Sequence, residues 1–221
     1  MRFIKRAIVW FLALSIGFTL LYRFAPVPLT ITMVLDENGF TRDWTPLSRI
    51  DRNMAAAVIA GEDAKFCTHS GFDQEAIEDA MERNAKGKRL RGGSTISQQV
   101  AKNVFLWQGS GWDRWLRKGL EAWFTVLIET VWTKRRIMEV YLNVAETGIG
   151  TYGVEAGAQR YFGKSAAHLT RIEAARMAAA LPSPKTRAVK GPRGFTYRHG
   201  NTIAARIQVV RGEGLDGCVY E

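Results

Sequence analysis

Residues 91–103 read RGGSTISQQVAKN, a polar stretch with few apolar side chains to pack into a core. Thr95 followed three residues later by Gln98 matches a capping box, so a helix is expected to begin just after Thr95. Gly92 and Gly93 come directly before it and allow backbone angles that other residues resist. The sequence therefore predicts a glycine hinge that leads into a capped helix.

One face of this predicted helix carries a distinctive set of groups. At helical spacing Thr95, Gln99 and Lys102 share that face, and Gln98 lies beside them. A helix N-terminus with amide donors and an ammonium group is a good receptor for phosphate or pyrophosphate. Solvated polar helices have the same composition, however, so this stretch alone leaves both interpretations open.

Composition narrows the class of protein. The chain has 221 residues, a net charge of +10 and a pI near 9.9, which suit one medium domain with an appendage. Such a charge favours a polyanionic partner: nucleic acid, an anionic membrane surface or a phosphorylated substrate. Cys67 and Cys218 are too few for a disulfide framework, and we predict two unpaired thiols rather than one long-range bridge.

The N-terminus has the features of a membrane anchor. Arg2, Lys5 and Arg6 precede an uncharged run over residues 7–22, which with its flanks approaches the roughly 20 residues that span a bilayer. A cleaved signal peptide is the alternative, but no small-x-small cleavage site follows the run. We predict a retained single-pass anchor at residues 1–25, with a cytoplasmic N-terminus and the rest outside. Nucleic acid is then excluded as a partner, and the membrane or a lipid phosphate is favoured.

The rest of the chain is expected to be one mainly α domain. Residues 26–46 form a linker with a short strand over 29–35 and a turn at 36–39, and residues 47–221 form the domain. Residues 185–201 match no motif and are expected to wrap the surface before the last helix. Apolar periodicity and caps predict helices over 53–62, where Asn53 is the cap, 73–86, 95–103, 111–133, 134–143, 152–162, 169–181 and 202–210.

A second charged element lies in RKGLEAWFTVLIE, residues 117–129. Arg117 and Lys118 precede Glu121 by four and three residues, so intrahelical ion pairs are the ordinary explanation. The surrounding helix is otherwise apolar, and we therefore expect these charges to face a cleft.

A third element, EDAKFCTHSG at residues 62–71, ends an alanine-rich helix with two adjacent carboxylates. Cys67 and His69 alone are too few to ligate a metal, so no metal site is predicted. Glu62, partly desolvated beside Phe66, suits a general base.

Aromatic residues surround a glycine-containing loop at residues 108–111. Core packing and insertion into the membrane interface both fit this pattern, and the sequence leaves the two open. The aromatic and apolar residues concerned are Phe105, Leu106, Trp107, Trp112 and Trp115.

Four ordered motifs together carry a family resemblance. EDxxFxxHxG, GxSTIxQQxxKN, RKxxEA and KxxxxExYLN occur at residues 62–71, 93–103, 117–122 and 134–143. The chain resembles the peptidoglycan glycosyltransferases, the polymerase domain of bifunctional penicillin-binding proteins and of monofunctional relatives, over residues 47–184. No Ser-x-x-Lys motif of a transpeptidase occurs, so the resemblance is to the monofunctional, membrane-anchored form.

The resemblance implies a lysozyme-like helical lobe with a small membrane-proximal jaw. It also implies lipid II as acceptor and a growing glycan on undecaprenyl pyrophosphate as donor. Glu62 maps to the family's base, which deprotonates the 4-hydroxyl of the acceptor so that it attacks the donor with inversion. Glu121 maps to a second glutamate near the donor phosphates, with a positioning or metal-assisting role.

The remaining motif residues receive roles on the same basis. A lipid pyrophosphate is already a good leaving group and needs countercharge rather than a proton, which Lys102, Arg117 and Lys118 supply. Residues 91–103 are then a pyrophosphate cradle and a mobile acceptor flap. Other substrate-binding residues are Thr95, Gln98, Gln99, Asp63, Phe66, His69 and Asn103. The last motif contributes Glu139, Tyr141 and Asn143, of which Glu139 and Asn143 are interpreted mainly as struts.

The resemblance requires no cofactor, although a divalent cation such as Mg²⁺ or Mn²⁺ would assist departure of a pyrophosphate. It places the domain on the outer face of the plasma or inner membrane, where cell-wall synthesis or division proteins are candidate partners. Two alternatives remain open: a lysozyme-like lytic enzyme that cleaves glycan, and a membrane-tethered scaffold without catalysis. Neither accounts for the cation cluster and the carboxylate together.

Overall fold

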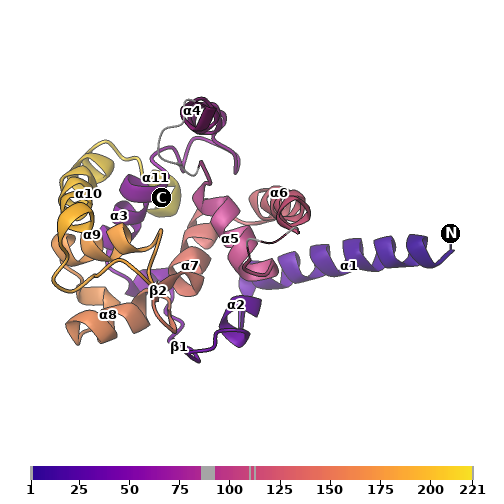
Figure 1. Cartoon of the computed structure of the whole chain (residues 1–221), viewed down its shortest axis with the longest axis horizontal. Coiled ribbons are helices and arrows are strands. Elements are labelled where there is room, and N and C mark those ends of the chain that lie inside the picture. Colours follow the sequence, from indigo (N-terminus) through magenta and orange to yellow (C-terminus); the bar gives the residue numbers. More distant parts are fainter. Residues whose placement is uncertain (1, 86–92, 110, 112, 221) are drawn as a thin grey trace.

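The computed structural model describes residues 2–85, 93–109, 111 and 113–220, and it is mainly helical, as predicted (Figure 1). Short 3-10 turns at Leu47–Arg49 and Ala166–His168 join some of the helices. The α-helices are α1 (Arg2–Phe24), α2 (Ile31–Val34), α3 (Arg52–Glu62), α4 (Gln74–Ala85), α5 (Ile96–Phe105), α6 (Arg114–Val131), α7 (Lys134–Val144), α8 (Val154–Phe162), α9 (Arg171–Ala180), α10 (Gly194–Gly212) and α11 (Gly217–Tyr220).

Helix α1 projects from the body of the protein in Figure 1 and is long and apolar enough to cross a membrane. Its 23 residues correspond to about 35 Å, slightly more than the hydrocarbon core of a bilayer. The helix packs against α6, where Ser15 and Thr19 are buried. The Trp123 indole donates to the Ser15 hydroxyl at 3.3 Å, and Trp132 donates to the Thr19 carbonyl at 2.7 Å. These contacts favour retention of α1 over its removal as a signal peptide.

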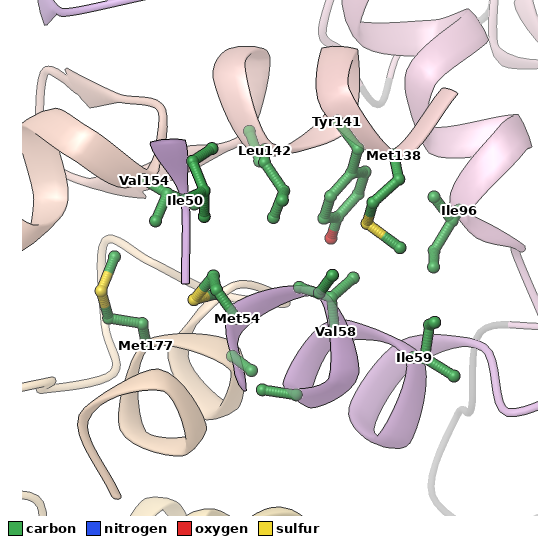
Figure 2. Packing of buried hydrophobic residues seen from close by; sticks show 14 of the residues in the cluster. Ile50, Met54, Val58, Ile59, Ile96, Met138, Tyr141, Leu142, Val154 and Met177 are labelled. Atoms are coloured by element: carbon green, nitrogen blue, oxygen red, sulfur yellow. The ribbon is translucent and has the colours of Figure 1, made fainter. Parts of the chain in front are cut away.

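Helix α3 forms the centre of the core. It packs against α9 and α10, and Figure 2 shows Val58 of α3 facing Tyr141 of α7 across the buried cluster. Fully buried alanines at 55–57 allow the neighbouring helices to approach closely. The helix begins one residue earlier than predicted, because Asp51 rather than Asn53 is the cap and accepts from the Asn53 amide at 2.8 Å. The core thus fixes the helix that ends at Glu62.

The predicted strand over residues 29–35 is wrong, because this segment contains α2. The Thr30 hydroxyl accepts from the Met33 amide and caps a short helix, which outweighs the β propensity of its branched side chains. The turn at 36–39 is confirmed, with the Gly39 amide donating to the Asp36 carbonyl at 2.9 Å.

A small sheet joins the predicted linker to the domain. Strand β1 (Thr41–Arg42) pairs in parallel with β3 (Thr151–Tyr152), which pairs antiparallel with β2 (Glu146–Gly148). Because β1 lies within residues 26–46, this segment is packed on the domain rather than extended. Tyr152, predicted to begin a helix, belongs instead to β3, and the helix begins after Gly153, whose φ is +81°.

The other predicted helices agree with the structure within a few residues, except the last. Helix α10 begins at residue 194 instead of 202, so part of the predicted surface wrap is helical. The predicted end of α4 at residue 86 lies outside the described residues.

The two cysteines form a disulfide, and the prediction of free thiols is wrong. Cys67, in the loop after α3, is bonded to Cys218 in α11, with their Cα atoms 5.5 Å apart. The two cysteines are 151 positions apart in the sequence, which gives no sign that they meet. An ion pair and a hydrogen bond dock the C-terminal segment on the domain and bring them together. Arg52 pairs with the buried Asp216 at 2.7 Å, and Arg135 donates to the Val219 carbonyl at 2.8 Å.

Replacing both cysteines by serine is expected to lower the free energy of unfolding by about 2–5 kcal/mol, because the bond closes a long loop in the unfolded chain. For a chain of this size the apparent Tm should fall by roughly 5–15 °C. Thermal melts of the detergent-solubilised protein, with and without reductant, measure this. Reductant should lower the Tm of the wild type and leave that of the double variant unchanged; equal melts for all samples would contradict the prediction.

Candidate functional site

Glu62 ends α3 and is held by a chain of hydrogen bonds that crosses three helices. Its Oε2 accepts from Nε2 of Gln99 on α5 at 2.9 Å, and Gln99 Oε1 accepts from the hydroxyl of Tyr141 on α7 at 3.3 Å. Burial raises the pKa of Tyr141 well above its usual value, and the nearby Glu62 and Asp63 carboxylates raise it further. Tyr141 therefore keeps its proton and remains a hydrogen-bond donor.

The Glu62 carboxyl has the electrostatic properties of a general base. Burial raises its pKa, and the adjacent Asp63 carboxylate adds to the rise. The hydrogen bond from Gln99 and the positive charges of Arg187 and Lys102 partly oppose this shift. A carboxylate with a raised pKa is a stronger base than a solvated one, so Glu62 is suited to removing a proton from a hydroxyl group.

Asp63, the next residue, braces the loop that follows α3. Its buried carboxylate contacts His69 Nε2 at 2.9 Å and accepts from the Ile96 amide at the start of α5 at 3.0 Å. The Phe66 ring is fully buried, with the Lys134 ammonium 4.7 Å from its centroid. These contacts connect the loop after Glu62 to the N-terminus of α5. Roles for Asp63, Phe66 and His69 in substrate binding stay predictions.

The capping box at the start of α5 is confirmed. Thr95 Oγ1 accepts from the Gln98 amide at 3.2 Å, and Gln98 Oε1 accepts from the Thr95 amide at 3.0 Å. The Thr95 hydroxyl also donates to the Gly71 carbonyl at 2.6 Å, and both side chains are buried. These atoms hold the helix in place, and hydrogen bonds from them to a substrate stay a prediction.

Gly93 serves close packing rather than an unusual backbone angle. Its φ is not positive, but a Cβ at this position would lie 3.0 Å from the Ala76 carbonyl oxygen of α4. Residues 91–92, which include the other predicted hinge glycine, lie outside the described residues.

The cations predicted to bind an anion gather around one pocket of about 380 Å³, which we call the cationic pocket. Lys118 forms an ion pair with the buried Glu121. Arg117 donates to the Gly109 carbonyl at 2.6 Å, while its buried Nε has no hydrogen-bond partner among the described residues. The pocket is lined by Lys102, Arg114, Trp115, Arg117, Lys118 and Glu121.

Lys102 is held in an environment that favours an anion beside it. Burial lowers the pKa of this ammonium, and the charges of Arg117 and Lys118 lower it further, against the opposing effect of Glu121. The Lys102 ammonium forms no hydrogen bond or ion pair with the part of the chain that the structure describes. A bound phosphate would relieve both the desolvation and the repulsion between the cations.

Lys102 also lines a second pocket, of about 210 Å³, which we call the Glu146 pocket. Gln99 and Tyr141 line it too, so it lies beside the hydrogen-bond chain that holds Glu62. Asn103 is part of its wall and accepts from the exposed Gln108 at 3.3 Å. The two pockets are neighbours that share Lys102 in their walls, one lined mainly by charged side chains and the other by a mixture of polar and apolar ones.

Glu139 and Asn143 act as struts in the structure. Asn143 Oδ1 accepts from the Thr45 amide at 2.7 Å and its Nδ2 donates to the Thr45 carbonyl at 2.9 Å. Glu139 accepts from the Leu47 amide at 2.9 Å. They fasten the segment before α3 to α7, which carries Tyr141.

Arg187 is a site residue that the sequence did not indicate. It lies in the segment that matches no motif, yet its charge acts on Glu62. Its guanidinium donates to the Ala179 carbonyl at 2.9 Å and stacks 5.1 Å from the Phe195 ring centroid. A lone arginine among many in a basic chain carries no distinguishing pattern, so only the fold reveals it.

The aromatic residues around the glycine loop divide between the two interpretations. Phe105 stacks on Phe124 with ring centroids 4.3 Å apart, and Leu106 is buried, so both belong to the core. Trp115 is 78% exposed beside the exposed Leu116, as expected for a membrane interface. Residues 110 and 112 lie outside the described residues.

Among the described residues, no group of three or more His, Cys, Asp or Glu side chains could hold a metal ion. Of the described residues that line the cationic pocket, Glu121 alone has a carboxylate.

Comparison with known proteins gives a consistent result. The family model described as transglycosylase matches residues 30–208. The chain is 49% identical to the biosynthetic peptidoglycan transglycosylase of Caulobacter vibrioides, with 99% of each chain covered. It is 46% identical to the proteins of that name from Bdellovibrio bacteriovorus, covering 100% of this chain and 90% of the relative, and from Rhodospirillum centenum, covering 94% and 90%.

The cationic pocket is expected to bind a diphosphate. Lys102→Ala and Arg117→Ala should each weaken the binding of farnesyl pyrophosphate by about tenfold or more, because each removes a charge-assisted hydrogen bond. Isothermal titration calorimetry measures the affinity. Lys190→Ala, an exposed lysine that does not line the pocket, is the control and should bind as the wild type does. Equal affinities for all variants would show that the anion binds elsewhere.

Proposed function

The chain belongs to the transglycosylase family, and we propose that it polymerises lipid II into linear peptidoglycan strands by inverting glycosyl transfer, releasing undecaprenyl pyrophosphate. The observation that carries this proposal is the pairing of one desolvated carboxylate with a cationic pocket. Gln99 connects the two: it donates a hydrogen bond to the Glu62 carboxylate, and Lys102 follows it about one helical turn later on α5.

In the proposed reaction Glu62 takes the proton from the 4-hydroxyl of the acceptor sugar. The oxygen attacks C1 of the donor sugar from the face opposite the pyrophosphate, a new glycosidic bond forms, and the C1–O bond to phosphate breaks. Lys102, Arg117 and Lys118 stabilise the negative charge that collects on the departing pyrophosphate. Inversion at C1 follows from attack on the opposite face.

The same geometry disfavours a lytic enzyme. A glycosidase protonates its leaving group and uses a second carboxylate to activate water or attack the sugar. The second glutamate here, Glu121, is buried and ion-paired with Lys118 among other cations. Its partner is therefore a cation rather than a water or a sugar, and cations around the leaving group serve a pyrophosphate rather than an alkoxide.

We propose that no resident cofactor is needed, because protein cations supply the countercharge. If Mg²⁺ accompanies the substrate, Glu121 would offer one ligand and the pyrophosphate oxygens the others.

We also propose that α1 anchors the domain on the extracytoplasmic face of the membrane. Arg2, Lys5 and Arg6 at its N-terminal end support a cytoplasmic N-terminus. The Cys67–Cys218 disulfide gives independent support, because such bonds persist in oxidising compartments outside the cytoplasm.

Glu62→Gln tests the proposed function. The substitution keeps the shape of the side chain and removes the base, so turnover of lipid II into polymer should fall by roughly 10²–10⁴-fold. The assay separates polymer from lipid II by electrophoresis, and an unchanged Tm shows that the variant is folded. Glu213→Gln, an exposed glutamate, should keep full activity.

Other outcomes identify the alternatives. Shortening of finished glycan without polymer formation would identify a lytic enzyme. A scaffold would make no polymer and would keep its cellular role with Glu62→Gln.

The acid limb of the pH dependence of kcat/KM should lie above the ordinary glutamate pKa of about 4.3, because burial raises the pKa of Glu62. The rate rises with pH as the base loses its proton. Gln99→Met removes a hydrogen bond that lowers this pKa, so its acid limb should move to higher pH. Initial rates measured from about pH 4 to about pH 8, the range in which glutamates and histidines titrate, give the position of the acid limb in each protein. Gln208→Met changes an exposed glutamine on α10 and is the control. An acid limb that stays in place or moves to lower pH in Gln99→Met would refute the assignment of Glu62 as the base.

A further inference from the structure

The Glu146 pocket contains two polar atoms that nothing in the reaction described above uses. Thr32 Oγ1 and Glu146 Oε1 are both buried, and neither has a hydrogen-bond partner among the described residues. Thr32 comes from α2 and Glu146 from the start of β2, so two segments far apart in the chain line the pocket together. Buried polar atoms without a partner cost free energy unless a ligand or water satisfies them.

The groups around Glu146 leave its carboxylate available. The nearest cation, Lys185, has its Nζ 3.6 Å from Oε1, an ion pair too long for a hydrogen bond, and its side chain is 53% exposed. The neighbouring Tyr152 hydroxyl is already committed, because it donates to Asp36 Oδ2 at 2.7 Å. Asp36 remains an ionised acceptor, since hydrogen bonds from Asn38 and Tyr152 lower its pKa to about 2.

The position of the pocket identifies the part of the substrate that reaches it. Lys102 lines both pockets, so the Glu146 pocket is next to a pyrophosphate bound in the cationic pocket. The donor pyrophosphate carries a lipid on one side and a sugar, followed by the rest of the glycan, on the other. The polar groups of the Glu146 pocket suit the sugar rather than the lipid. Sugars present hydroxyl and acetamido groups, which match a carboxylate acceptor and a threonine hydroxyl.

We propose that Glu146 and Thr32 bind the saccharide of the donor through its hydroxyl or acetamido groups and so orient it for transfer. The inference rests on the proposed function and extends it to two residues outside the four sequence motifs. Glu146 accepts hydrogen bonds from the sugar, and Thr32 donates or accepts one. The segment that follows the membrane anchor thereby becomes part of the donor site.

The experiment uses the full chain in detergent, with a fluorescent lipid-linked tetrasaccharide whose terminal 4-hydroxyl is blocked. This molecule acts only as donor, and unlabelled lipid II is the acceptor, so the labelled hexasaccharide reports transfer between the two. For Glu146→Ala the donor KM should rise about tenfold, the usual effect of losing a hydrogen bond in a buried site. The acceptor KM and kcat should stay within about twofold of the wild type.

Glu146→Gln and Thr32→Val preserve the shape of the pocket and should raise the donor KM by a smaller factor, which keeps the test valid if Glu146→Ala fails to fold. Glu37→Gln and Thr202→Val, exposed residues that line neither pocket, are matched controls and should behave as the wild type. A rise in the acceptor KM, or an unchanged donor KM in folded variants, would overturn the inference. A wild-type protein that forms no hexasaccharide would instead overturn the proposed function.

Discussion

The hydrogen-bond chain from Tyr141 through Gln99 to Glu62 is the constraint on which the site depends. Each member lies on a different helix, so the position of the carboxylate is set by how α3, α5 and α7 pack. The packing also creates the electrostatic environment, because the burial that raises the pKa of Glu62 is a product of the same interface. Core stability and basicity thus have one origin, and loosening these helices changes both together.

The division of charge within the cleft separates two chemical tasks. The Glu62 carboxylate, which forms no ion pair with the described residues, removes a proton. Cations on α5 and α6, among them Lys102, stabilise the leaving group. Gln99 is neutral and lies between the two regions, so it transmits position without neutralising either charge. Glu62 and Lys102 act on each other through their charges without forming an ion pair, so each group stays available for its own task.

The sequence predicts most of the longer helices and the motif residues that meet at the site, because caps, apolar periodicity and four ordered motifs are local features. It does not predict α2, whose segment reads as a strand, or the first turns of α10. Glu62, Gln99 and Lys102 were all identified before the fold was known. What the sequence could not provide depends on distant segments meeting. The Cys67–Cys218 bond, the charge of Arg187 beside Glu62 and the strand pairing of the linker arise only from tertiary packing. Residues such as Asp63 and Thr95 match motifs, yet their polar atoms brace the backbone.

If α1 spans the membrane as proposed, its docking on α6 sets the height of the domain above the bilayer. Because Trp123 and Trp132 hold the anchor by hydrogen bonds, the anchor and the catalytic lobe translate and tilt as one body. The reacting carbon of a lipid-linked sugar also stands at a set elevation, determined by its own pyrophosphate at the membrane surface. When the active site and the reacting carbon lie at the same height above the bilayer, the enzyme meets its substrate by lateral diffusion in the membrane alone. Elongation then displaces the polymer outward while the protein stays at constant depth.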